Sequence, residues 1–168
     1  LGGRLTAGAF IMTTMVFIAI VLSGIQSAVM DYNRLRWLGM TGTNLKNHVI
    51  VCGWSSISKV AIPELLAAGR QVAVICEDQN EISLIKELCG DDRQLFITVG
   101  DPTGLPALKR VNHLEAHTLI IATPEDTTNL ISSLNVRLHN PELRIIVYVQ
   151  RPELRTTFSA SGVTYVAS

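Results

Sequence analysis

Hydroxyl-bearing residues and one glycine follow the apolar segment Val49–Cys52 directly. The run Gly53-Trp54-Ser55-Ser56-Ile57-Ser58 keeps the first glycine of the dinucleotide-binding pattern G-x-G-x-x-G, with Ser55 and Ser58 at the other two glycine positions. Gly53 can make the tight turn, and a helix starting after it offers free N–H groups to a phosphate. Ser55 either weakens the approach of a pyrophosphate or donates a hydrogen bond to a phosphate oxygen.

Carboxylates and a threonine close the next three apolar segments. Glu77 stands where a carboxylate accepts both ribose hydroxyls and repels a 2′-phosphate. The alternatives are a helix cap for Glu77 and Asp78 and a turn before Pro102 for Asp101. Because the carboxyl ends of parallel strands meet at one edge, we predict a cleft for NAD(H) or another adenine nucleotide. The predicted binding residues are Gly53, Trp54, Ser55, Ser58, Glu77, Asp78, Asp101 and Thr123.

No catalytic or metal-binding constellation is visible in the sequence. The four histidines lie apart, without a cysteine or carboxylate at ligand spacing, so we predict solvated or capping roles for His48, His113, His117 and His139. The cysteines match no metal spacing and no secreted disulfide pattern, which predicts reduced thiols at Cys52, Cys76 and Cys89. We therefore predict a binding protein and not an enzyme.

Strand and helix patterns alternate after residue 47. The predicted strands are rich in Val and Ile without polar alternation, as in parallel strands covered on both faces: His48–Cys52, Gln71–Glu77, Gln94–Val99, Thr118–Thr123, Arg144–Gln150 and Thr164–Ala167. The predicted helices are Ser56–Ala68, Gln79–Leu88, Leu105–Val111, Glu125–Leu138 and Pro152–Ser161. This α/β alternation predicts a Rossmann-like, doubly wound parallel sheet with strand order 3-2-1-4-5-6.

A transmembrane helix is predicted ahead of this sheet, within residues 1–30. The uncharged stretch Leu5–Met30 makes a helix of roughly 39 Å, against a bilayer core of about 30 Å. Residues 31–47 are the predicted linker, and its basic residues Arg34, Arg36 and Lys46 place the C-terminal domain in the cytoplasm of a cell-membrane protein. The 14 basic and 14 acidic residues balance, so the charge predicts no nucleic-acid partner.

Residues 48–168 resemble the N-terminal lobe of an RCK domain, also called a TrkA-N or KTN domain, which regulates potassium conduction. The matching motifs are Val49-Ile50-Val51-Cys52-Gly53-Trp54-Ser55, Cys76-Glu77-Asp78, Gly100-Asp101-Pro102-Thr103 and Ser161-Gly162-Val163-Thr164-Tyr165-Val166. The membrane segment is similar to the inner helix of a two-helix potassium channel, with Gly3-Arg4-Leu5 at its start. The chain starts at Leu1 and stops at Ser168, so we expect a fragment whose selectivity filter lies upstream.

The resemblance implies a tetrameric pore of identical subunits in membrane lipid, with potassium as the permeant ion and a ring of RCK lobes that senses a nucleotide. The exposed faces of Glu125–Leu138 and Pro152–Ser161 are the expected subunit contacts. Two departures matter. Thr13-Thr14 occupies the place of a hinge glycine, with Gly8 and Gly24 off register.

The second departure concerns calcium. In calcium-gated relatives, carboxylates follow strand four and lie on strand five, but this chain has Ala122 and Tyr148-Val149-Gln150 there. Hard cations need several oxygen ligands, so calcium is not expected at that site.

Two other classes remain open from the sequence. A cation–proton antiporter with a regulatory RCK lobe would also carry a helix before this fold. A membrane-anchored, nucleotide-dependent oxidoreductase would need a catalytic domain elsewhere in the chain.

Overall fold

The computed structural model describes residues 2–90 and 92–168. The chain forms two compact units, a helical one that ends at Trp37 and a domain of Leu38–Ser168. Side chains of the helical unit are described from Met12 onward, so those of Gly3-Arg4-Leu5 and Gly8 lie outside the described residues.

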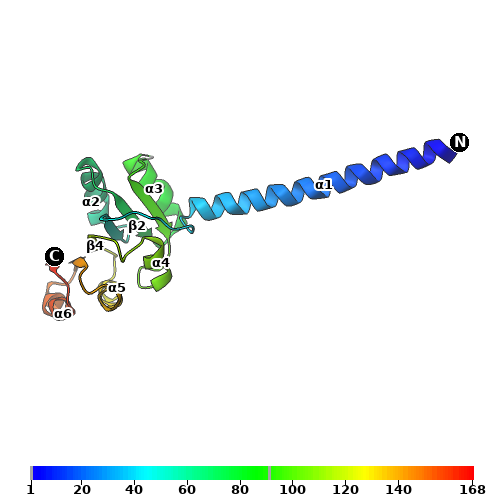
Figure 1. Cartoon of the computed structure of the whole chain (residues 1–168). Coiled ribbons are helices and arrows are strands. Elements are labelled where there is room, and N and C mark those ends of the chain that lie inside the picture. Colours follow the sequence, from blue (N-terminus) through cyan, green and yellow to red (C-terminus); the bar gives the residue numbers. More distant parts are fainter. Residues whose placement is uncertain (1, 91) are drawn as a thin grey trace. The chain divides into compact units, whose positions relative to one another are not determined.

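The first unit is one continuous helix, α1 (Gly2–Trp37) (Figure 1). Its segment Met12–Trp37 has 26 residues and a hydropathy of 1.8, and is long and apolar enough to cross a membrane. The helix is unbroken through Thr13-Thr14, where the sequence offered no hinge glycine. It extends past Met30 to Trp37, so the first seven residues of the predicted linker are helical.

The domain is built on six parallel strands in the order β3-β2-β1-β4-β5-β6, which confirms the predicted topology. The strands are β1 (Val49–Cys52), β2 (Val72–Cys76), β3 (Leu95–Val99), β4 (Thr118–Ile121), β5 (Arg144–Tyr148) and β6 (Tyr165–Ala167). Every residue of β1 and β2 is buried, as expected for central strands covered on both faces.

Helices cover the sheet on both sides (Figure 1). On one face, α2 (Ser56–Ala67) and α3 (Gln79–Cys89) supply Ile62, Ile82 and Ile85 to one core. On the other face, α4 (Leu105–Arg110), α5 (Asp126–His139) and α6 (Arg155–Ala160) supply Leu108, Val136 and Phe158 to a second core. The last predicted helix begins as a 3₁₀ turn, Pro152–Leu154, before α6.

Two of the histidines are buried, so of the two predicted roles, solvated or capping, the solvated one is wrong for them. His48 and His113 are 0% and 2% exposed, and their rings hydrogen-bond to the carbonyl oxygens of Val111 and Leu108, at 2.7 and 3.0 Å. These carbonyls end α4, so the capping alternative holds for both. Burial lowers the pKa of each imidazole, which favours its neutral form.

The segment Leu38–Asn47 is packed onto the domain. Its attachment to β3 is a hydrogen bond of 3.1 Å from the Val99 N–H to the Leu38 carbonyl. Further bonds run from the Thr43 N–H to the Arg110 carbonyl and from the Asn47 N–H to the Glu115 carbonyl, both at 2.8 Å. Residues 38–47 are therefore hydrogen-bonded to the rest of the domain, beginning with Leu38, the first residue after α1.

Gly39 makes this docking possible. It is buried with a φ of +67°, and an added Cβ would overlap the carbonyl oxygen of Ile97 and lie 2.8 Å from the Cα of Thr98. Both the backbone conformation and the available space exclude a side chain at this position.

We predict that Gly39→Ala lowers the free energy of unfolding of the domain by about 3 kcal/mol, the sum of left-handed strain and overlap. The matched control is Gly69→Ala, where φ is +71° but nothing lies within 4 Å of the new Cβ. This control carries the strain alone, about 1 kcal/mol. Urea unfolding of the chain in mild detergent measures both, and equal losses would contradict the packing of residue 39 on β3.

Candidate functional site

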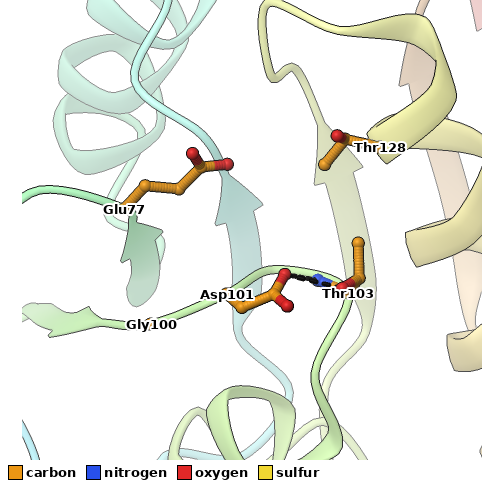
Figure 2. Close-up of a pocket in the computed structure, with 5 residues that line it drawn as sticks. All are labelled: Glu77, Gly100, Asp101, Thr103 and Thr128. Atoms are coloured by element: carbon orange, nitrogen blue, oxygen red, sulfur yellow. Dashed lines mark hydrogen bonds between the residues drawn. The ribbon is translucent and has the colours of Figure 1, made fainter.

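Two hollows lie at the carboxyl edge of the sheet. The first, of about 430 Å³, is lined by Glu77, Gly100, Asp101, Thr103 and Thr128 (Figure 2). The second, of about 540 Å³, is lined by Ser55, Ser56, Thr123, Pro124, Tyr148 and Gln150. Together they follow the ends of strands β1 to β5, which is where ligands bind in open α/β sheets.

Glu77 follows β2 and is the unpartnered carboxylate of the first hollow. Figure 2 shows its side chain extending from the strand end into the pocket. Among the described residues, none donates a hydrogen bond to its carboxylate, although its own N–H donates to Glu81 Oε2 at 3.2 Å. Burial, followed by repulsion from Glu81, Asp101 and Glu125, raises the pKa of Glu77. This carboxylate is available to accept hydrogen bonds from a ligand.

Asp101 shapes the loop after β3. Its Oδ1 accepts from the Thr103 N–H at 2.8 Å and from the Thr103 hydroxyl at 2.6 Å, which closes an Asx turn (Figure 2). Asn135 of α5 donates to the Thr103 carbonyl at 2.8 Å and fixes the same loop from the other side. The floor of the first hollow is therefore held rigidly against α5.

Gly53 makes the turn between β1 and α2. Its φ is +92°, and a Cβ would lie 2.8 Å from the Cα of Thr123 at the end of β4. Ser58, at the third glycine position of the pattern, is buried and donates from its hydroxyl to the Gly53 carbonyl at 2.7 Å. Ser55, at the second, caps α2 by accepting from the Ser58 N–H at 3.4 Å. Both serines thus stabilise the turn from within.

A buried amide, which the sequence reasoning missed, holds the other wall of the second hollow. Asn129 of α5 is fully buried, and its Oδ1 accepts from the Thr123 hydroxyl at 2.6 Å and from the Thr123 N–H at 3.1 Å. Its Nδ2 donates to the carbonyls of Thr123 and Tyr148, at 3.2 and 3.1 Å. This side chain ties the ends of β4 and β5 together, and its polar character within a helix near a strand end was the only signal in the sequence.

The structure brings four of the predicted site residues to the hollows: Glu77 and Asp101 to the first, and Ser55 and Thr123 to the second. Gly53 forms the turn beside them. Ser58 is buried beneath the turn, and Asp78 caps α3 in a capping box with Glu81. Trp54 packs against the α2–α3 core, with the Lys59 ammonium 5.6 Å from its ring centroid. Thr103 and Thr128 were not predicted.

Asp126, the nearest buried carboxylate to the second hollow, is already paired. It accepts from the Gln150 N–H at 2.9 Å and from the N–H and Nε of Arg151 at 3.2 and 3.1 Å. Burial alone would raise its pKa, but these hydrogen bonds outweigh burial and lower it. Within residues 12–90 and 92–168, no group of three or more His, Cys, Asp or Glu side chains is placed to hold a metal ion.

We predict that millimolar calcium leaves the melting temperature of the chain in detergent unchanged, because Asp126, the one buried carboxylate among the described residues, is paired with Arg151. Magnesium at the same concentration controls for ionic strength. A saturable rise of several degrees with calcium alone would contradict this assignment of Asp126.

Comparison with known proteins fits this geometry. Residues 49–168 match the TrkA-N domain family. The chain belongs to this family. Potassium channel protein 1 of Methanocaldococcus jannaschii is 26% identical over 155 residues, covering 89% of this chain and 46% of the channel protein. The chain thus spans less than half the length of this relative.

The TrkA-N fold also aligns with solved structures. The GsuK channel bound to NAD aligns with a TM-score of 0.64 and 20% identity, over 74% of this chain and 22% of that one. GsuK bound to ADP aligns with a TM-score of 0.64 and 21% identity, over 74% of this chain and 31% of that one. At this identity the likeness establishes the fold.

Proposed function

We propose that this chain forms the pore-lining helix and the nucleotide-sensing cytoplasmic lobe of a potassium channel subunit. The observation that carries the proposal is the extent of the similarity to the M. jannaschii channel protein. It covers 89% of this chain, more than residues 38–168 alone can supply, so it reaches into the membrane-length helix. This shared helix favours a channel over an antiporter or an anchored oxidoreductase.

The residues of the cleft fit an adenine nucleotide, NAD(H) included. The unpartnered Glu77 carboxylate can accept from ribose hydroxyls, and the free N–H groups at the start of α2 can bind a phosphate. Because residue 53 is a glycine, the β1–α2 turn can lie against Thr123 at the end of β4. The second hollow, lined by Ser55 and Thr123, lies beside this contact. The NAD and ADP complexes of GsuK, which has the same fold, support this class of ligand.

Ligand binding here is proposed to regulate and not to catalyse. The described residues that line the two hollows include no histidine, cysteine or lysine. The Thr123 hydroxyl donates to the amide oxygen of Asn129, which is not a base. The Asp101 carboxylate that accepts from the Thr103 hydroxyl also accepts from the Thr103 N–H, so it closes the local turn. Burial raises the pKa of Cys52 to about 12, which leaves this thiol unreactive.

A short route through backbone hydrogen bonds leads from the cleft to Leu38, the first residue after α1. Gly100, which lines the first hollow, donates to the Cys76 carbonyl at 2.9 Å, and its neighbour Val99 donates to Leu38. A ligand that favours one packing of the lobes would shift their population, and the bonded segment 38–47 would pass the change to α1.

The outer face of α5 is the proposed contact with identical subunits in a tetramer. Ile131, Leu134 and Leu138 are 45%, 43% and 76% exposed, whereas Leu130 packs against the core. Along α6 only Phe158 is buried, so the outer face of this helix is also open to a contact with another subunit. Apolar side chains gathered on one helix face are typical of a protein contact.

We predict that Glu77→Ala weakens NAD binding by about 1–3 kcal/mol, because a charged acceptor for the ribose is lost. It should also reduce the preference for NAD over NADP, since the carboxylate no longer repels the 2′-phosphate. Titration calorimetry on the chain in detergent measures both quantities. Glu142→Ala, an exposed residue at the opposite edge of the sheet, is the control and should change neither. If no adenine nucleotide binds at millimolar concentration, the sensing role is wrong.

The channel assignment predicts that the full-length protein, reconstituted in liposomes, passes potassium faster than sodium. A pore-lining helix of this kind has to accompany a selectivity filter. Flux is measured with a potassium gradient and then a matched sodium gradient, with and without nucleotide. Equal flux of the two ions, or no flux under any condition, would overturn the channel assignment while leaving nucleotide binding intact.

A further inference from the structure

The cleft is lined by negative charge and by no described cation. Glu77 and Asp101 line the first hollow, and Glu81 and Glu125 lie close enough to raise the pKa of Glu77 after burial has done so. The residues of the second hollow are all neutral. A phosphate-binding site usually shows the opposite pattern, with arginine or lysine side chains facing the ligand.

The nearest described cations line neither hollow. The Arg110 guanidinium donates to the Val99 carbonyl at 2.8 Å and to the Thr98 hydroxyl at 2.9 Å, behind Gly100. Lys59 lies over the Trp54 ring, and Arg151 is paired with Asp126. Among the described residues that line the two hollows, the attraction for phosphate comes from the start of α2, which favours one anionic group near its N–H groups.

These charges predict an order of binding affinity among the adenine nucleotides. In the nucleotide site proposed above, the first phosphate would lie at the start of α2, and each further phosphate would add negative charge that the surrounding carboxylates repel. In water, repulsion between two unit charges about 10 Å apart weakens binding by about twofold. Three carboxylates acting together on one added phosphate charge weaken it by about fivefold or more at low salt.

We propose, building on the nucleotide site above, that the cleft selects adenosine ligands by low negative charge. AMP and NAD, whose nicotinamide ring is cationic, bind more tightly than ADP, and ADP binds more tightly than ATP. The carboxylates of Asp101, Glu81 and Glu125 set this order, while Glu77 also contacts the ribose.

The test is calorimetric titration of the whole chain in detergent with AMP, ADP and ATP. The buffer contains EDTA, because a divalent cation would neutralise the added phosphates. At low salt we expect affinity to fall by about fivefold with each added phosphate, and the steps to shrink at high salt as the carboxylates are screened. Screening would have the opposite effect at a basic phosphate site.

One charge can be removed without disturbing the fold. Glu125 is exposed at the start of α5 and its side chain makes no capping hydrogen bond. Because ATP carries two more negative charges than AMP, Glu125→Gln should raise the affinity for ATP by about fourfold relative to AMP. Glu142→Gln, equally exposed but at the other edge of the sheet, should leave the ratio unchanged.

The outcomes separate the two proposals. The charge selection alone would be overturned if ATP bound as tightly as AMP at low salt. It would also be overturned if the ATP-to-AMP affinity ratio were the same in Glu125→Gln as in the Glu142→Gln control. Failure of every nucleotide to bind would overturn the sensing role, and the charge selection with it.

Discussion

The contact between the β1–α2 turn and the end of β4, at Gly53 and Thr123, determines the geometry of the cleft. A backbone that passes this close admits no side chain at residue 53, and the positive φ independently requires glycine there. Asn129 then joins the end of β4 to the end of β5. Gly53 also donates from its N–H to the Ile75 carbonyl of β2 at 2.9 Å, so the start of α2 and the strand end that carries Glu77 belong to one rim.

The same contact explains why the glycine pattern is only partly kept. At the first position a Cβ would meet backbone atoms of β4, which cannot move aside without breaking the sheet. At the other two positions the serine hydroxyls find partners within the turn, so the side chains are accommodated. Serine in place of the second and third glycines of the pattern therefore changes the side chains at the turn, while the backbone still makes the turn.

The sheet order and nearly all element bounds were predictable because the strands are continuous Val and Ile runs and glycine or proline marks their ends. The positions of Glu77 and Asp101 on one edge followed from the parallel topology alone. The Asn129 and Asp126 networks were not predictable, because each joins groups far apart in sequence and depends on the final packing. The burial of His48 and the docking of Leu38 escaped prediction for the same reason.

The Leu38–Val99 hydrogen bond has a mechanical consequence. A free segment of about ten residues behaves as a soft entropic spring whose ends wander about 17 Å apart, and it would absorb a small movement of the domain. Here the chain is bonded to β3 at the first residue after the helix, so no slack remains between them. A displacement of β3 would therefore carry Leu38 with it, without the play that a free tether of ten residues would allow.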